Sequence, residues 1–76
     1  MNQDERRAKK IVIDQFDSMF EVLNLLEPLP IFLDREWQLF LDKGHNPVTP
    51  IEIATEFMAY LEERKYVIIP KGKWVI

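Results

Sequence analysis

The chain has 76 residues and a formal net charge of -3, from 10 Lys and Arg residues against 13 Asp and Glu residues. This length favours one small domain, which we expect to span residues 1–76. The content of hydrophobic residues (47%) and charged residues (30%) excludes the disordered class. The absence of cysteine excludes a disulfide framework and a thiolate zinc site.

The charge is strongly segregated along the chain. Residues 1–10 carry four basic and two acidic side chains, a net charge of +2, and residues 64–76 carry four basic side chains and no carboxylate, a net charge of +4. Residues 11–63 carry eleven carboxylates and two basic side chains, a net charge of -9. Either the basic ends cover an acidic middle and offset its self-repulsion, or one or both ends meet an acidic partner.

The first predicted element is a long helix from about Gln3 to Leu26. Asn2 and Glu5 have the spacing of a capping box at its start. Apolar side chains recur at steps of three or four residues and so form one helical face: Ala8, Val12, Phe16, Met19, Leu23 and Leu26. The apolar face broadens in the second half, which predicts contacts on two sides, within the domain or with a second copy.

Pro28 and Pro30 are expected to end that helix, because proline disfavours the helical conformation of the residue before it. We then expect an extended stretch over Ile31–Leu33 and a second helix over Arg35–Lys43, with Asp34 as its cap. Gly44 is the expected stop of this helix. Three side chains of the second helix are predicted to face inward: Trp37, Phe40 and Leu41.

The third helix has the clearest local signal. Thr49 is the expected cap, Pro50 suits the first helical position, and Glu52 closes a capping box. The helix is predicted to run to about Arg64. Its inward face is expected to hold Ile51, Ala54, Phe57, Met58 and Leu61.

The last segment has the pattern of a β-hairpin. Its strands are predicted over Tyr66–Ile69 and Lys73–Ile76, with the turn at Pro70–Gly72, where Gly72 takes a left-handed conformation. Both strands are apolar on both faces, so one face must pack on the helices and the other is exposed or covered by something else. The expected fold is α+β: three helices with a C-terminal β-hairpin.

This order of elements resembles the winged helix-turn-helix superfamily, most closely in the run AYLEERKYVIIPKGKWVI, which is similar to a third helix followed by a wing. The resemblance implies DNA binding. However, the exposed start of the third helix carries Glu52, Thr55 and Glu56, and phosphates would repel these carboxylates. DNA would therefore have to contact the basic ends: Arg6, Arg7, Lys9, Lys10, Lys71 and Lys73.

Protein binding uses the same features without this conflict. An acidic third helix can dock on a basic protein surface, and tryptophan is enriched at the centres of interfaces. The predicted protein-binding residues are Glu52, Glu56, Tyr66 and Trp74. The favoured function is therefore a small regulatory or adaptor-type protein-binding module, self-associating as a dimer through the first helix and the edge of the terminal strand. DNA-binding regulation is the alternative.

Catalysis lacks the necessary side chains. The single histidine, His45, lies in a turn, and the single serine, Ser18, lies on a distant helix, so a nucleophile–base pair is not expected. Two glycines cannot build a phosphate-binding loop. Carboxylates at Asp14, Asp17 and Glu21 share a helix face and could chelate a divalent ion, but solvated carboxylates are the favoured interpretation. We expect no enzyme activity, metal, cofactor or small-molecule substrate.

Targeting signals are also missing from the sequence pattern. The N-terminal residues are polar, with no apolar segment behind the positive charges. The longest nearly unbroken apolar run, LPIFL, is far shorter than the roughly 20 residues of a spanning helix. A cytoplasmic protein without a membrane partner is the expectation.

Overall fold

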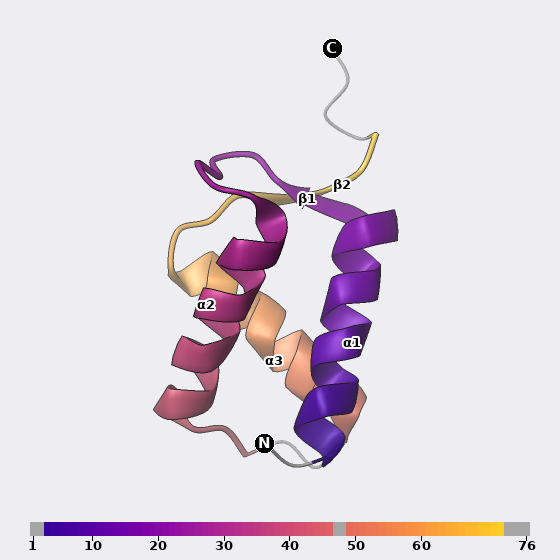
Figure 1. The fold of residues 1–76 in the computed structure, drawn as a ribbon, viewed down its shortest axis with the longest axis vertical. Helices are drawn as coiled ribbons and strands as arrows, with labels where there is room; N and C mark the ends of the chain where they lie inside the picture. The colour runs from indigo at the N-terminus through magenta and orange to yellow at the C-terminus, as the bar shows by residue number, and fades with distance from the viewer. Residues whose placement is uncertain (1–2, 47–48, 73–76) are drawn as a thin grey trace.

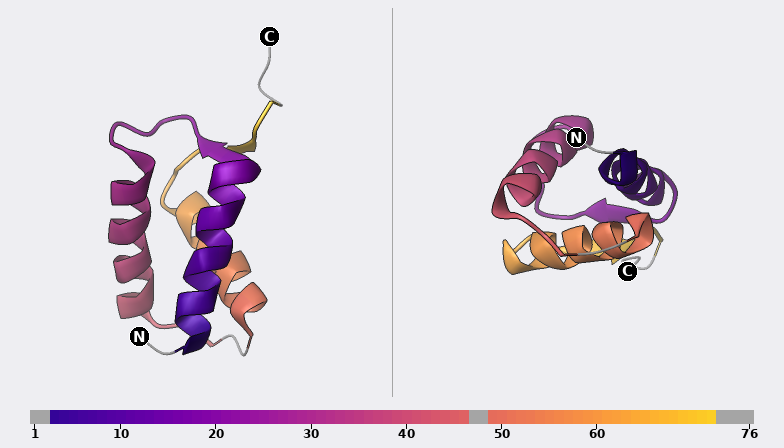
Figure 2. Two further views of the ribbon diagram at one scale, coloured as in Figure 1. Left: turned by 45° about the vertical axis from the view of Figure 1, so that its right-hand side comes forward. Right: turned by 90° about the horizontal axis from the view of Figure 1, so that it is seen from below.

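The computed structural model describes residues 3–46 and 49–72. Three helices lie side by side and a two-stranded antiparallel sheet crosses one end of them (Figure 1; Figure 2). The elements in chain order are α1 (Gln3–Ser18), β1 (Phe20–Val22), α2 (Leu29–Lys43), α3 (Pro50–Glu63) and β2 (Ile68–Pro70). This confirms the α+β class with three helices, and the layout is compatible with a winged-helix-like order.

The core lies between the three helices, and each helix contributes one buried stripe. An aromatic cluster is at its centre, where the Phe57 ring lies 5.0 Å from Trp37 and 5.4 Å from Phe40, measured between ring centroids. The predicted stripe of α1 is confirmed as far as Phe16. The buried apolar side chains are Ala8, Val12, Phe16, Phe32, Leu33, Trp37, Phe40, Ile53, Ala54, Phe57 and Leu61.

The first helix is shorter than predicted, because it ends at Ser18 and not at Leu26. The main-chain N–H of Leu23 donates to Val67 (2.9 Å) and that of Lys71 donates to Met19 (2.7 Å), on either side of β1. Pairing with a strand far along the chain therefore overrides the helical spacing of the sequence. The broad apolar pattern of this segment belongs to a strand that buries one face.

The second helix begins earlier than predicted, because Ile31–Leu33 is helical and not extended. Pro30 is tolerated because the first turn of a helix has no internal partner for its N–H groups. Phe32 donates its main-chain N–H to Pro28 (3.1 Å), which starts the helix upstream of the predicted cap. Asp34 is therefore no cap. Its carboxylate lies 2.8 Å from Lys9 Nζ and joins α2 to α1.

The start of α3 is confirmed. Thr49 Oγ1 accepts the main-chain N–H of Glu52 at 3.2 Å, and Pro50 is in the first turn. One inward position was wrong: Ile51 is 69% exposed, whereas Ile53 is buried. The helical stripe is rotated because α3 is covered by both α1 and α2, so its buried side includes Ile53 on the flank.

The C-terminal segment forms a strand and a turn. Pro70 was predicted in the turn, but it is the last residue of β2 and pairs with Phe20. Its missing N–H costs no sheet hydrogen bond, because Phe20 and Pro70 are a pair that exchanges no main-chain hydrogen bonds, whereas the next pair, Met19 and Lys71, is bonded. The left-handed conformation of Gly72 is confirmed by a φ of +82°. The second predicted strand, Lys73–Ile76, lies outside the described residues.

Lys65 has a φ of +72°, a left-handed conformation that costs a non-glycine residue about 1 kcal/mol. We expect Lys65→Gly to raise the free energy of unfolding by about 0.5 kcal/mol, because glycine removes this cost but loses more chain entropy. Lys10→Gly, in the exposed part of α1, should instead lower it by about 1 kcal/mol. Urea denaturation of both variants measures this difference. If Lys65→Gly and Lys10→Gly lowered the free energy of unfolding by the same amount, the backbone of Lys65 would not be strained.

Candidate functional site

The outer face of the two-stranded sheet carries exposed apolar side chains, with the Glu21 carboxylate between them on β1. Side chains alternate across a strand, so Phe20, Val22 and Ile68 pack on the core while their neighbours face outward. Met19, Leu23 and Val67 are 53%, 51% and 46% exposed, and Leu26, in the turn after β1, is fully exposed. We call these four residues the sheet-end surface. Apolar side chains gathered in this way are typical of interaction sites.

Asn24 holds the two halves of this surface together. Its side-chain amide donates to the main-chain oxygen of Lys65 at 3.1 Å, and its Oδ1 accepts the N–H of Val67 at 3.0 Å. The amide therefore joins the turn after β1 to the segment before β2 and keeps Leu23 beside Val67. Sequence reasoning missed Asn24 because it placed this residue inside the first helix.

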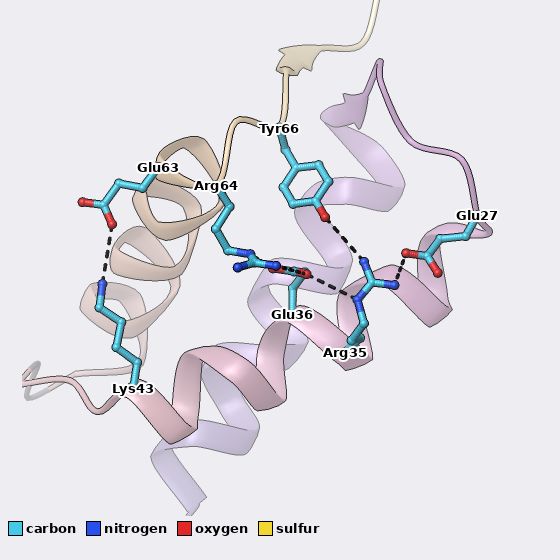
Figure 3. Close-up of polar contacts among 7 residues, drawn as sticks. All are labelled: Glu27, Arg35, Glu36, Lys43, Glu63, Arg64 and Tyr66. Atoms are coloured by element: carbon cyan, nitrogen blue, oxygen red, sulfur yellow. Dashed lines mark hydrogen bonds and ion pairs between the residues drawn. The ribbon is translucent and has the colours of Figure 1, made fainter.

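A buried carboxylate, Glu36, lies between α2 and the end of α3 (Figure 3). Its side chain is 0% exposed, and Arg64 reaches it with Nε at 2.5 Å from Oε1 and with Nη2 at 3.2 Å from Oε2. Arg35 Nε lies 3.4 Å from Oε2. Burial of a carboxylate is costly unless cations and hydrogen-bond donors surround it, and the two guanidinium groups meet this need.

Arg35 extends this network to the sheet end. It pairs with Glu27 and donates to the Tyr66 hydroxyl at 3.5 Å (Figure 3). The hydrogen bond to Glu27 raises the pKa of Arg35, and the hydrogen bond to Glu36 raises the pKa of Arg64. Both guanidinium groups are thus committed to carboxylates within the chain. Their chemical effect is to fix the exit of α3 against α2.

One sequence signal could have found the buried carboxylate. Glu36 lies four residues after Phe32 and four before Phe40, so it occupies the apolar stripe of the helix. The prediction instead placed it in the first turn of a shorter helix, where a carboxylate is ordinary. The partner Arg64 could not be found from spacing, because it comes from another helix.

The predicted protein-binding residues do not form one group. Glu52 and Glu56 lie on the exposed side of α3, where the Thr49 hydroxyl donates to Glu52 at 3.1 Å. Tyr66 lies beyond the other end of α3, half-buried, with its ring 4.7 Å from Phe32. Trp74 lies outside the described residues.

The predicted nucleic-acid residues are divided between the two ends of α1. Arg6, Arg7 and Lys10 are exposed on its N-terminal half. Lys9 is half-buried and paired with Asp34. Lys71 lies at the opposite end, where its ammonium group donates to the main-chain oxygen of Asp17 and complements the negative end of the helix dipole. Lys73 lies outside the described residues.

His45 ties the segment after α2 to the start of α1. Its Nε2 lies 3.0 Å from Glu5 Oε2, and its ring stacks on Phe40 with centroids 5.3 Å apart. Ser18, at the other end of α1, donates to the main-chain oxygen of Asp14 at 2.7 Å. His45, which contacts Glu5 near the start of α1, and Ser18, the last residue of α1, are therefore separated by nearly the length of this helix.

Two further features concern metals and membranes. Among residues 3–46 and 49–72, His, Asp and Glu side chains form no group of three that could hold a metal ion. Within the same ranges, every helix is too short or too polar to cross a bilayer.

Comparisons of this chain with protein-family models, with curated proteins and with solved structures give no match.

Proposed function

We propose that this chain is a small, non-enzymatic, cytoplasmic protein-binding module of regulatory or adaptor type, and that its partner binds at the sheet-end surface. The observation that carries the proposal is the set of exposed apolar side chains on the outer face of the sheet, where Met19, Leu23 and Val67 are about half exposed and flank the Glu21 carboxylate. Asn24 and the Arg35–Tyr66 contact hold this face in place before any partner arrives. Such preorganisation lowers the entropy cost of binding.

The occupant we propose is an amphipathic helix of another protein. Both strands have only three residues, and Pro70 lacks an N–H, so the edge of β2 offers little for a partner strand to pair with. The side chains of the outer face offer more, because they can receive the apolar stripe of a helix. Lys65 is exposed two residues before Val67, and Glu21 faces outward from β1, so an acidic residue of the helix toward Lys65 and a basic residue toward Glu21 would complement the surface.

Leu23→Glu tests this proposal. The partner is first recovered from host lysate by crosslinking, identified and purified, and its affinity for the chain is then measured by titration calorimetry. We expect Leu23→Glu to weaken binding at least about tenfold, because a carboxylate would be buried against an apolar stripe. Ile51→Glu is the matched control, since Ile51 is 69% exposed on α3 and lies outside the surface.

Two results would overturn the proposal. The first is equal affinity of Leu23→Glu and the unchanged chain for the purified partner. The second is the failure of every crosslinked protein to bind the purified chain. Circular dichroism of both variants establishes that each is folded.

The alternative function is DNA binding of winged-helix type through the basic residues. It is favoured by one observation: Arg6, Arg7 and Lys10 are exposed on α1, and no carboxylate of the described residues pairs with them. The exposed carboxylates of α3 oppose it, because they would face the phosphates. Gel-shift assays at low and high salt decide this point, and the absence of any retardation at low salt would end the DNA hypothesis.

A further inference from the structure

A second surface lies along α1, next to the groove between α1 and α2. Four side chains at successive spacings of four, three and four residues form one straight stripe on this side: Arg6, Lys10, Ile13 and Asp17. This is the spacing with which two helices pack lengthwise against each other. Ile13 is 36% exposed at the middle of the stripe, and the three charged residues are exposed.

Ile13 lies between Lys10 and Asp17 and borders two hollows of the surface. Toward the N-terminus of α1 it borders a shallow surface formed by Arg6, Lys9 and Lys10. Toward the C-terminus it lines an apolar groove between α1 and α2, together with Leu29, Pro30 and Leu33, and this groove has Asp17 and Asp34 at its rim. Lys9 and Asp34 are paired with each other within the chain, so the charges of this surface that remain for a partner are Arg6 and Lys10 on one side of Ile13 and Asp17 on the other.

We infer that a second copy of this chain packs antiparallel on this surface, with the two Ile13 side chains at the twofold axis. The midpoint between Lys10 and Asp17 falls next to Ile13, so an antiparallel pair places Lys10 of each copy opposite Asp17 of the other. A parallel pair would place like charges opposite each other. A twofold interface needs a self-complementary surface, and this stripe has that property.

This dimer rests on the proposed protein-binding function, but it uses a surface separate from the sheet-end surface. The apolar part is small, since it consists of Ile13 and the walls of one groove. The interface should therefore be of the weak, transient class. Charge pairs of this exposed kind set orientation and partner choice more than affinity, and added salt weakens them.

Charge exchange between Lys10 and Asp17 tests the inference. Sedimentation equilibrium at low salt should find a reversible dimer of the unchanged chain. Lys10→Glu and Asp17→Lys should each weaken the dimer about tenfold, and the double variant should restore it, because the pairs form again with exchanged signs. Because Lys71 already donates to the main-chain oxygen of Asp17, circular dichroism of Asp17→Lys is needed to establish that this variant is folded.

The matched controls are Arg7→Glu and Asp14→Lys. These residues are exposed, carry the same charges and are also seven residues apart, but they are rotated about 60° away from the stripe. We expect both controls to dimerise like the unchanged chain. A monomer at all accessible concentrations, equal effects of Lys10→Glu and Arg7→Glu, or no restoration in the double variant would each overturn the dimer.

The two proposals fail separately in this design. Titration of Lys10→Glu with the purified partner of the sheet-end surface should give unchanged affinity. If the dimer is absent but the partner binds, only the dimer is wrong. If the dimer forms as described but Leu23→Glu has no effect on partner binding, only the sheet-end surface is wrong.

Discussion

Replacement of Phe57 by alanine is expected to lower the free energy of unfolding by about 4 kcal/mol. Phe57 is 0% exposed and is packed between Trp37 and Phe40, so its removal leaves a cavity that rigid aromatic neighbours cannot fill. A domain of this size has a total stability of only about 4–11 kcal/mol. The midpoint temperature of thermal unfolding, measured by circular dichroism, should therefore fall by roughly 20 °C, or the variant should show no cooperative unfolding at all.

Ile51→Ala is the control for this prediction. Ile51 is in the same helix but is 69% exposed, so we expect a change of less than about 0.5 kcal/mol. A comparable loss of stability in both variants would contradict the position of the core between the helices. The comparison also tests whether Ile51 is exposed at the start of α3, where the sequence pattern placed it facing inward.

Arg64→Ala is expected to lower the free energy of unfolding by about 2 kcal/mol. Breaking a buried ion pair typically costs about 3–5 kcal/mol, but the Arg64 side chain is 41% exposed and its loss would admit water to Glu36. Urea denaturation measures the change. Arg64→Lys should recover only part of it, because lysine lacks the planar guanidinium group that reaches both carboxylate oxygens.

Glu36→Leu separates the role of the charge from the role of packing. Leucine of similar size leaves no buried charge, so we expect stability equal to or above that of the unchanged chain. In this background Arg64→Ala should cost less than about 0.5 kcal/mol. A full loss of about 2 kcal/mol in the double variant would show that Arg64 acts through some other contact.

Both stability tests bear on the sheet-end surface. Arg64 and Arg35 fix the segment that carries Tyr66 and Val67 against α2. In the leucine variant this anchoring is weakened while the core is retained. We therefore expect Glu36→Leu to lower the affinity for the partner without lowering stability, because the charged network preorganises the binding surface.

The candidate sites were only partly predictable from the sequence. The nucleic-acid residues were predicted as a group, but the pairing of Lys9 with Asp34 and the place of Lys71 at the far end of α1 depend on how the elements lie. Asn24 gave no signal, because an amide in an expected helix is unremarkable. Its two hydrogen bonds reach residues more than forty positions away, and no local pattern contains that information.

The sequence by itself determined the elements whose stability is local. Thr49, Pro50 and Glu52 specify the start of α3 through side-chain and main-chain contacts within one turn. The apolar spacing of Ala8, Val12 and Phe16 likewise marked the buried face of α1. These signals hold because they need no distant partner.

The tertiary structure decided the rest, and the small size of the domain explains why. Met19, Leu23 and Leu26 have a helical spacing, yet residues 20–22 become a strand because β2 supplies main-chain partners that a helix end would lack. Ile31–Leu33 became helical because Phe32 and Leu33 complete the core from α2. So short a chain must draw its core from all three helices and the sheet, so packing overrides local preference where the two disagree.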